Sequence, residues 1–287
     1  MIKCFFVSDL HGHEDRYISL FEEIKKEKPA IVFIGGDILL SGVAYSKSRY
    51  NSNKDFLNKF LYPSMEFVKY KMGEEYPEIY LIMGNDDPRE EEESIIKAAQ
   101  KNIFKYIHNR KIGFNDFTIY GYAYVPPTPF RLKDWEKYDV SRFTDPGCNA
   151  PIDGIHTVPV DEHQLMYSTI KDDLEKLTGN DNLEKSVFLF HSPPHNTKLD
   201  YANLDGKKID GVELDVHVGS IAIRKFIEKR KPLITLHGHI HESVRITGSW
   251  KDKIGDTLCF SAAHDKKELA LVEFDLEKPE EANRRLI

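Results

Sequence analysis

Residues 232–243 read PLITLHGHIHES, a short apolar run that ends in three histidines within five residues. The run at 233–236 has the length and composition of a buried strand. His239 and His241 share one side of an extended backbone, because strand side chains alternate. Neutral imidazole is the commonest metal ligand among side chains. The stretch therefore indicates half of a metal site, or alternatively a turn whose histidines bind water at the surface.

Composition places the chain among ordinary globular proteins. It has 287 residues, 40% of them hydrophobic and 11% aromatic, with a formal net charge of −7. A chain of this size can bury a substantial core, and its negative charge disfavours nucleic acid or an anionic membrane as a partner. Three scattered cysteines without a CxxC pair are typical of a reducing compartment. With no signal-peptide pattern and no apolar stretch of about 20 residues, the expected location is the cytoplasm.

Short apolar runs with β-branched or aromatic residues predict buried strands. The runs cover residues 3–7, 30–34, 79–82, 117–120, 187–190, 233–236, 258–261 and 269–274. Helical periodicity is clear over 17–24 and looser over 56–61 and 165–177. Ser220 is the predicted N-cap of a helix at 221–231 that Pro232 ends. This alternation predicts an α/β fold.

We expect one domain over residues 1–287, interrupted by two segments. Residues 41–53 are polar and loop-like, and residues 122–164 are loop-rich, with proline, aromatic and aspartate residues. A long loop inside a compact domain is often functional. The segment at 122–164 is therefore either a cap over the site or a surface excursion.

Five of the predicted strands are followed directly by side chains that bind metals. The segments are SDLHGH at 8–13, GGD at 35–37, GNDD at 84–87, HSPP at 191–194 and HGHIH at 237–241, and each offers a carboxylate, an imidazole or an amide. Open α/β sheets place their ligands at the carboxyl ends of the strands, so these side chains are expected to meet there. Mixed oxygen and nitrogen ligands suit Mn, Fe, Zn, Ni or Co.

The order of these motifs resembles that of the calcineurin-like metallophosphoesterases. The chain has DLH at 9–11, GGD at 35–37, GND at 84–86, FHSPP at 190–194 and GHIH at 238–241. The resemblance implies a four-layer αββα sandwich of two mixed sheets flanked by helices, with two divalent metal ions. It implies that Asp9, His11 and His241 hold the first metal. By the same resemblance Asn85, His191 and His239 hold the second, and Asp37 bridges the two.

The resemblance also implies a phosphoesterase in which a hydroxide that bridges the two metals attacks phosphorus. Asp37, Asn85 and His191 are the residues that we expect to carry the reaction through their metals. The family motif G-N-H-[DE] has a histidine where this chain has Asp86, and an ionised carboxylate donates no proton. We therefore expect phosphodiesters to be favoured over monoesters, with a small molecule as the substrate.

Other side chains are candidates for substrate contact. Arg89 could pair with phosphate, and His13, His195 or His217 could replace the missing histidine. Each of these residues has a structural role as its alternative. The family pattern leaves His237 without a metal, so we expect it either to support a neighbouring metal ligand or to be structural.

Two other functions remain open. The first is a non-catalytic metal-binding scaffold of the same fold, which would be expected to have lost ligands, whereas all seven are present. The second is a Ser/Thr-type phosphoprotein phosphatase, against which the missing histidine counts.

Overall fold

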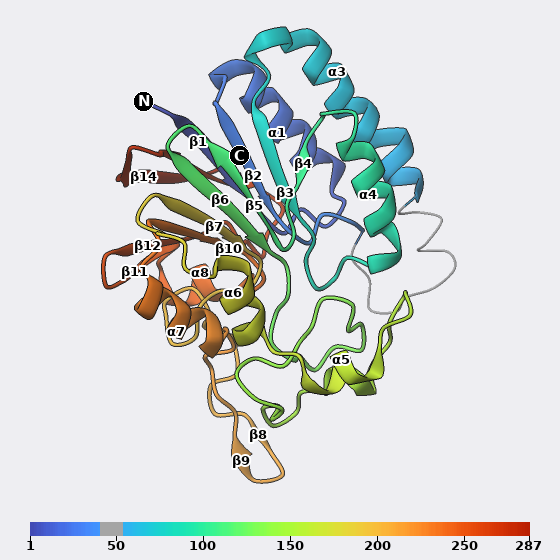
Figure 1. The fold of residues 1–287 in the computed structure, drawn as a ribbon, viewed down its shortest axis with the longest axis vertical. Coiled ribbons are helices and arrows are strands. Elements are labelled where there is room, and N and C mark those ends of the chain that lie inside the picture. Colours follow the sequence, from blue (N-terminus) through green and yellow to red (C-terminus); the bar gives the residue numbers. More distant parts are fainter. Residues whose placement is uncertain (41–53) are drawn as a thin grey trace.

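The computed structural model describes residues 1–40 and 54–287, so the predicted loop at 41–53 lies outside the described residues. Within them the chain forms two six-stranded mixed sheets that pack face to face (Figure 1). Helices cover the outer face of each sheet, which confirms the predicted four-layer α/β architecture. A two-stranded hairpin, β8 (Lys208–Ile209) and β9 (Val212–Glu213), extends away from the sheets.

The first sheet has the strand order β14-β13-β1-β2-β3-β4. Its strands are β1 (Lys3–Val7), β2 (Ile31–Gly35), β3 (Glu78–Ile82), β4 (Lys105–Tyr106), β13 (Ala270–Asp275) and β14 (Lys278–Leu286). The first four run parallel, and β13 and β14 are antiparallel to their neighbours. Its carboxyl ends therefore bring the segments after β1, β2 and β3 together.

The second sheet has the order β11-β12-β10-β7-β6-β5. Its strands are β5 (Arg110–Phe114), β6 (Phe117–Tyr122), β7 (Ser186–Phe190), β10 (Ile234–His237), β11 (Lys251–Ile254) and β12 (Thr257–Ser261). The four central strands are parallel, with antiparallel strands at both edges. The segments after β7 and β10 therefore also leave the sheet at one end.

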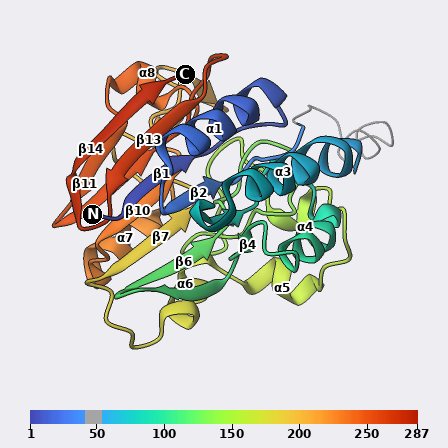
Figure 2. The ribbon, with the colours of Figure 1, turned by 90° about the horizontal axis from the view of Figure 1, so that it is seen from above.

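The helices flank the sheets in two groups (Figures 1 and 2). Beside the first sheet lie α1 (Glu14–Glu27), the π-helical turn Phe56–Leu61 that continues into α3 (Tyr62–Met72), and α4 (Glu92–Ala99). Beside the second lie α6 (Ile170–Thr178), α7 (Ile221–Arg230) and α8 (Ser243–Thr247). The short α5 (Glu162–Tyr167) follows the long loop after β6. Three single 3₁₀ turns lie at Gly73–Glu75, Arg89–Glu91 and Pro151–Asp153.

Strand alternation divides the core between the two faces of the second sheet. Val187 and Leu189 of β7 point between the sheets and join the larger core, whereas Phe188 and Phe190 point outward to the helices. All five residues of β7 are buried, because a strand covered on both faces reads as a continuous apolar run. This is the pattern on which the strand predictions rested.

The predicted helix at 221–231 is confirmed in its capping. The Ser220 hydroxyl accepts a hydrogen bond from the backbone N–H of Ile223 at 3.0 Å, and Lys231 adopts a left-handed conformation before Pro232. Several elements escaped prediction. The edge strands β5, β11 and β14 carry alternating charged and exposed side chains, and α4 begins inside an acidic run. Neither these edge strands nor the start of α4 has the continuous run of apolar residues from which the central strands were predicted.

Candidate metal centre

The predicted ligands lie where the carboxyl ends of the two sheets meet. Asp9, Asp37 and Asn85 follow β1, β2 and β3, and His191 and His239 follow β7 and β10. Backbone hydrogen bonds join neighbouring segments within each sheet: Asp9 N–H donates to Gly36 at 3.1 Å, and Gly238 N–H donates to His191 at 2.9 Å. The strand ends thus deliver ligands from both sheets to one place.

The first cluster consists of Asp9, His11, Asp37 and His241, whose ligand atoms all lie within 4.8 Å of one another. Nε2 of His11 lies 3.2 Å from Nε2 of His241, and the latter lies 3.3 Å from Oδ1 of Asp9. Both carboxylates are buried, with Asp9 1% and Asp37 3% exposed. The four side chains thus converge on a volume the size of a single ion.

A second cluster shares Asp37. Nε2 of His191 lies 3.2 Å from Oδ2 of Asp37 and 3.0 Å from Oδ1 of Asn85. The His239 ring lies beside it, with 5.3 Å between the centroids of the two imidazoles. Asp37 is therefore the residue that the two clusters have in common.

Backbone geometry holds several of these side chains in place. Four non-glycine candidates have positive φ: Asp9 (57°), His11 (47°), Asp37 (50°) and His239 (73°). Such conformations cost free energy for residues with a Cβ and concentrate at functional sites. The fold thus holds these four side chains in orientations that require an unfavourable backbone conformation.

Hydrogen bonds from the backbone orient the ligands further. Nδ1 of His191 lies 2.8 Å from the Gly35 carbonyl, so an Nδ1–H donates there and leaves Nε2 free to face the cluster. The backbone N–H of Asp86 donates to Oδ1 of Asp37 at 2.8 Å, and that of His239 donates to Oδ1 of Asp9 at 3.0 Å. The lone pairs that remain point into the cluster.

The buried carboxylates attract positive charge to the centre. Burial alone would lower the pKa of His191, but Asp37 and Asp9 raise it to about 9. Burial likewise opposes protonation of His11, whereas Asp86 and Asp37 raise its pKa to about 9. Burial also opposes ionisation of Asp37, yet His191 and His11 hold its pKa well below the ordinary value.

An unpartnered atom tests whether these residues fit a metal. Oδ2 of Asp9 is buried and has no hydrogen-bond partner among the described residues. In the same part of the chain, only histidines form ion pairs with the side chains of Asp9 and Asp37. Buried carboxylates need a counter-charge, and imidazole and carboxylate are ligands of divalent transition metals. The donor set therefore fits a divalent metal.

Two aspartates follow Asn85 and differ in their surroundings. Oδ2 of Asp86 lies 3.5 Å from Nδ1 of His11, and its side chain is 25% exposed. Asp87 is fully buried, and its carboxylate accepts from the backbone N–H groups of Leu39 at 2.8 Å and Gly84 at 2.8 Å. Asp87 thus ties the loop after β2 to the loop after β3, a role that its place in the sequence does not reveal.

The predicted substrate contacts have protein partners of their own. The Arg89 guanidinium lies 3.2 Å from Glu92 and 3.2 Å from the Tyr124 hydroxyl. Nδ1 of His217 lies 2.9 Å from the buried Asp200. Both side chains thus bind residues outside the two clusters, and their substrate roles remain proposals.

His195 and His13 complete the set of candidates. Nε2 of His195 lies 3.2 Å from Asp215, and its ring centroid lies 6.0 Å from that of His217. His13 precedes α1 as its N-cap residue and makes no side-chain cap hydrogen bond. A role of either histidine as a proton donor stays a prediction.

His237 is a structural residue. It is fully buried, with Nδ1 2.9 Å from the Ser192 carbonyl and Nε2 2.8 Å from the Thr235 hydroxyl. Burial lowers its pKa to about 3, so one nitrogen donates and the other accepts. Its ring stacks on Phe190 with 5.8 Å between centroids.

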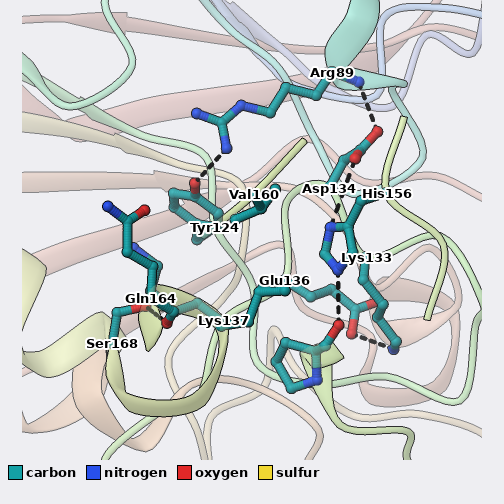
Figure 3. Close-up of a pocket in the computed structure, with 12 residues that line it drawn as sticks. Arg89, Tyr124, Lys133, Asp134, Glu136, Lys137, His156, Val160, Gln164 and Ser168 are labelled. Atoms are coloured by element: carbon teal, nitrogen blue, oxygen red, sulfur yellow. Dashed lines mark hydrogen bonds and ion pairs between the residues drawn. The ribbon is translucent and has the colours of Figure 1, made fainter. Parts of the chain in front are cut away.

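The loop between β6 and α5 is attached to the segment that follows Asn85. Asp134 accepts from the backbone N–H of Arg89 at 2.8 Å and from that of Thr157 at 2.8 Å. Figure 3 shows Arg89 reaching from this anchor to Tyr124, above a small cavity of about 60 Å³. The attachment joins this loop to the segment that follows the candidate ligand Asn85.

Comparison with known proteins gives a family and a fold. The model of the family described as calcineurin-like phosphoesterase matches residues 2–243. The uncharacterized protein MJ1162 of Methanocaldococcus jannaschii is 42% identical over 79 residues, which cover 27% of this chain and 30% of that relative. The chain thus matches less than a third of that relative's length.

Two solved structures have the same fold. TT1561 of Thermus thermophilus has a TM-score of 0.53 at 12% identity, over 99% of this chain and 98% of that one. A dimetal phosphatase from Danio rerio has a TM-score of 0.52 at 12% identity, over 95% of this chain and 91% of that one.

Within the described residues, every helix is too short or too polar to cross a membrane.

Proposed function

Because this chain belongs to the calcineurin-like phosphoesterase family, we propose that it hydrolyses phosphoester bonds with two divalent metals held at this centre. The observation that carries the proposal is the position of Asp37, whose carboxylate belongs to the first cluster and lies 3.2 Å from His191 of the second. A carboxylate has two oxygens and can serve two cations. Asp9, His11 and His241 would complete the first metal site, and Asn85, His191 and His239 the second.

Bound divalent metals would supply an activated water and neutralise charge on a phosphoryl group. The protein supplies position. The Gly35 carbonyl fixes the proton of His191 on Nδ1, and backbone N–H groups orient Asp37 and Asp9. The neutral amide of Asn85 adds an oxygen without adding negative charge to a site that must admit an anion. Mn, Fe, Zn, Ni and Co all suit these donors.

Asp86 supports a preference for phosphodiesters. Its carboxylate stands 3.5 Å from Nδ1 of His11, at the position where the family motif has a histidine. A monoester carries nearly two negative charges at neutral pH and a diester one, so a carboxylate at this place repels the monoester more strongly. A diester with a good leaving group also needs less proton donation, which Asp86 does not supply. Arg89, His195 and His217 are proposed as further substrate contacts.

We also propose that the chain is a single domain in which the loop at 122–164 covers the substrate. The hydrogen bond from the Arg89 backbone to Asp134 supports this, because it attaches the loop to the segment after Asn85. We further propose a small-molecule substrate rather than nucleic acid, which the net charge of −7 supports. The free cysteines Cys4, Cys148 and Cys259 support a reducing, cytoplasmic location.

The test combines metal analysis with hydrolysis of bis-p-nitrophenyl phosphate and p-nitrophenyl phosphate in Mn, Fe, Ni, Co or Zn. The expected result is bound metal, activity lost on chelation and restored by metal, and faster turnover of the diester. Asp37→Ala and His191→Ala are expected to lose metal and at least about 100-fold in kcat/KM. Unchanged metal content and turnover in both variants would refute the proposed site.

The same assay separates the alternatives. A non-catalytic scaffold would bind metal fully and turn over neither compound. A Ser/Thr-type phosphatase would prefer a phosphoserine peptide to the diester.

A further inference from the structure

A groove on the outer face of the second sheet lies apart from the proposed metal ligands. It runs between α6 and α7, which contact each other on that face (Figure 1), and encloses about 490 Å³. Its floor is made of Leu174, Ala222 and Phe226, which are 1%, 3% and 8% exposed. A groove of this volume falls in the range that accommodates side chains of a ligand.

The walls of the groove are basic. Lys225 and Lys229 lie on α7 one helical turn apart, followed by Arg230, and Lys171 lies on α6. Glu175 is the one acidic residue of the lining. The lining therefore carries an excess of three positive charges, on a chain whose net charge is −7.

The groove lysines are not neutralised from within the chain. In the part of the chain that the structure describes, Lys171, Lys225 and Lys229 form no ion pair, and all three are exposed. By contrast, Lys25 on α1 pairs with Glu22 at 2.6 Å, and Lys97 on α4 pairs with Glu93 at 2.6 Å. The groove lysines therefore offer their charge to a partner.

Arg230 joins α7 to the end of α6 through hydrogen bonds to neutral oxygens, so its positive charge is not neutralised by these contacts. Its guanidinium donates to neutral oxygens at the carboxyl end of α6, namely the Thr178 hydroxyl at 2.9 Å and the carbonyl of Gly179 at 3.0 Å. These bonds fix the end of α7 against α6. The guanidinium thus adds a positive charge at a defined position on the wall.

We propose that this groove docks an acidic amphipathic helix of a partner protein. Carboxylates one turn apart on such a helix match the spacing of Lys225 and Lys229, and its apolar side chains face the floor. A bilayer is flat and would not reach a floor recessed between two helices. Nucleic acid bases stack on exposed aromatic rings, whereas Phe226 is 8% exposed. Because the floor has little apolar surface left to bury, charge dominates the interaction.

The probe is a fluorescein-labelled helical peptide of about 15 residues, with leucines on one face and glutamates one turn apart beside them. Fluorescence anisotropy measures its binding to the full chain and to the double variant K225E/K229E. The variant K207E/K208E is the matched control, because it makes the same charge change on exposed lysines of the hairpin at β8. Circular dichroism and diesterase activity are measured on every variant.

We expect the wild type to bind the peptide with an affinity that falls as salt rises. K225E/K229E should weaken binding at least about tenfold, while K207E/K208E stays within about twofold of the wild type. Diesterase activity should be unchanged in both variants. Equal loss of binding in both variants, or no binding by the wild type, overturns the proposal. Binding of single-stranded DNA or phosphatidylserine vesicles through Lys225 and Lys229, in preference to the peptide, overturns it as well.

Discussion

Replacing Gly84 by alanine should damage the proposed metal centre through steric contact, because the φ of Gly84 itself suits alanine. Gly84 has no positive φ, so alanine can adopt its conformation. The added Cβ, however, would lie 2.4 Å from Oδ1 of Asp37 and 2.7 Å from Cε1 of His191, whereas ordinary contact starts at 3.4 Å. The two side chains must therefore retreat by 1.0 Å (3.4 − 2.4) and 0.7 Å (3.4 − 2.7). The Asp37 backbone nitrogen, at 2.5 Å, blocks an easy shift of the loop.

A misplacement of about 1 Å costs on the order of 100-fold in rate. We expect Gly84→Ala to lower kcat/KM for bis-p-nitrophenyl phosphate by that factor and to reduce metal content. The matched control is Gly113→Ala in β5, because a Cβ there meets nothing within 4 Å. Metal stoichiometry and thermal unfolding separate a damaged centre from a damaged fold. If Gly84→Ala keeps its metal and stays within about twofold of the wild-type rate, the steric reasoning is wrong.

Three further substitutions test the surroundings of the centre. His237→Ala should lower the free energy of unfolding by about 3 kcal/mol in urea denaturation, because it opens a cavity and leaves two buried hydrogen-bonding groups without partners. Loss of metal at unchanged stability would contradict the structural role of His237. Ser220→Ala should cost about 1–2 kcal/mol through the lost N-cap of α7, with the exposed Ser141→Ala as the control. Asp134→Ala should speed trypsin cleavage within residues 123–161 while the sheets persist by circular dichroism, because the partly buried backbone N–H groups of Arg89 and Thr157 lose their acceptor. An unchanged digestion rate would argue against this anchor.

The central strands could be predicted because their signal is local. β7 and β10 are buried on both faces, so each reads as an apolar run whatever the rest of the chain does. The start of α7 was also predictable, because Ser220 accepts its capping bond from a residue three positions on.

Edge strands and substrate contacts were not predictable in the same way. β14 is stabilised by pairing with β13, and its own residues are charged and largely exposed. Arg89 looked like a candidate for binding phosphate, but Tyr124, which is distant in sequence, accepts one of its hydrogen bonds. Asp87 had no predicted role, yet its carboxylate accepts a hydrogen bond from the backbone of Leu39 after β2. Partners from distant segments decide each of these roles.

By itself the sequence determined which side chains follow which strands, and the order of these motifs resembled that of a known family, which implied the seven candidate ligands. Strand direction and side-chain chemistry are local properties, so they can be read without the fold. The resemblance implied a bridging role for Asp37, but only the tertiary structure decided its geometry, with Oδ2 3.2 Å from Nε2 of His191, a residue from the other sheet. It also decided that His237 faces Ser192 and Thr235 while His239 and His241 face the carboxylates. Distances between residues of different strands depend on how the two sheets pack, and no local pattern encodes them.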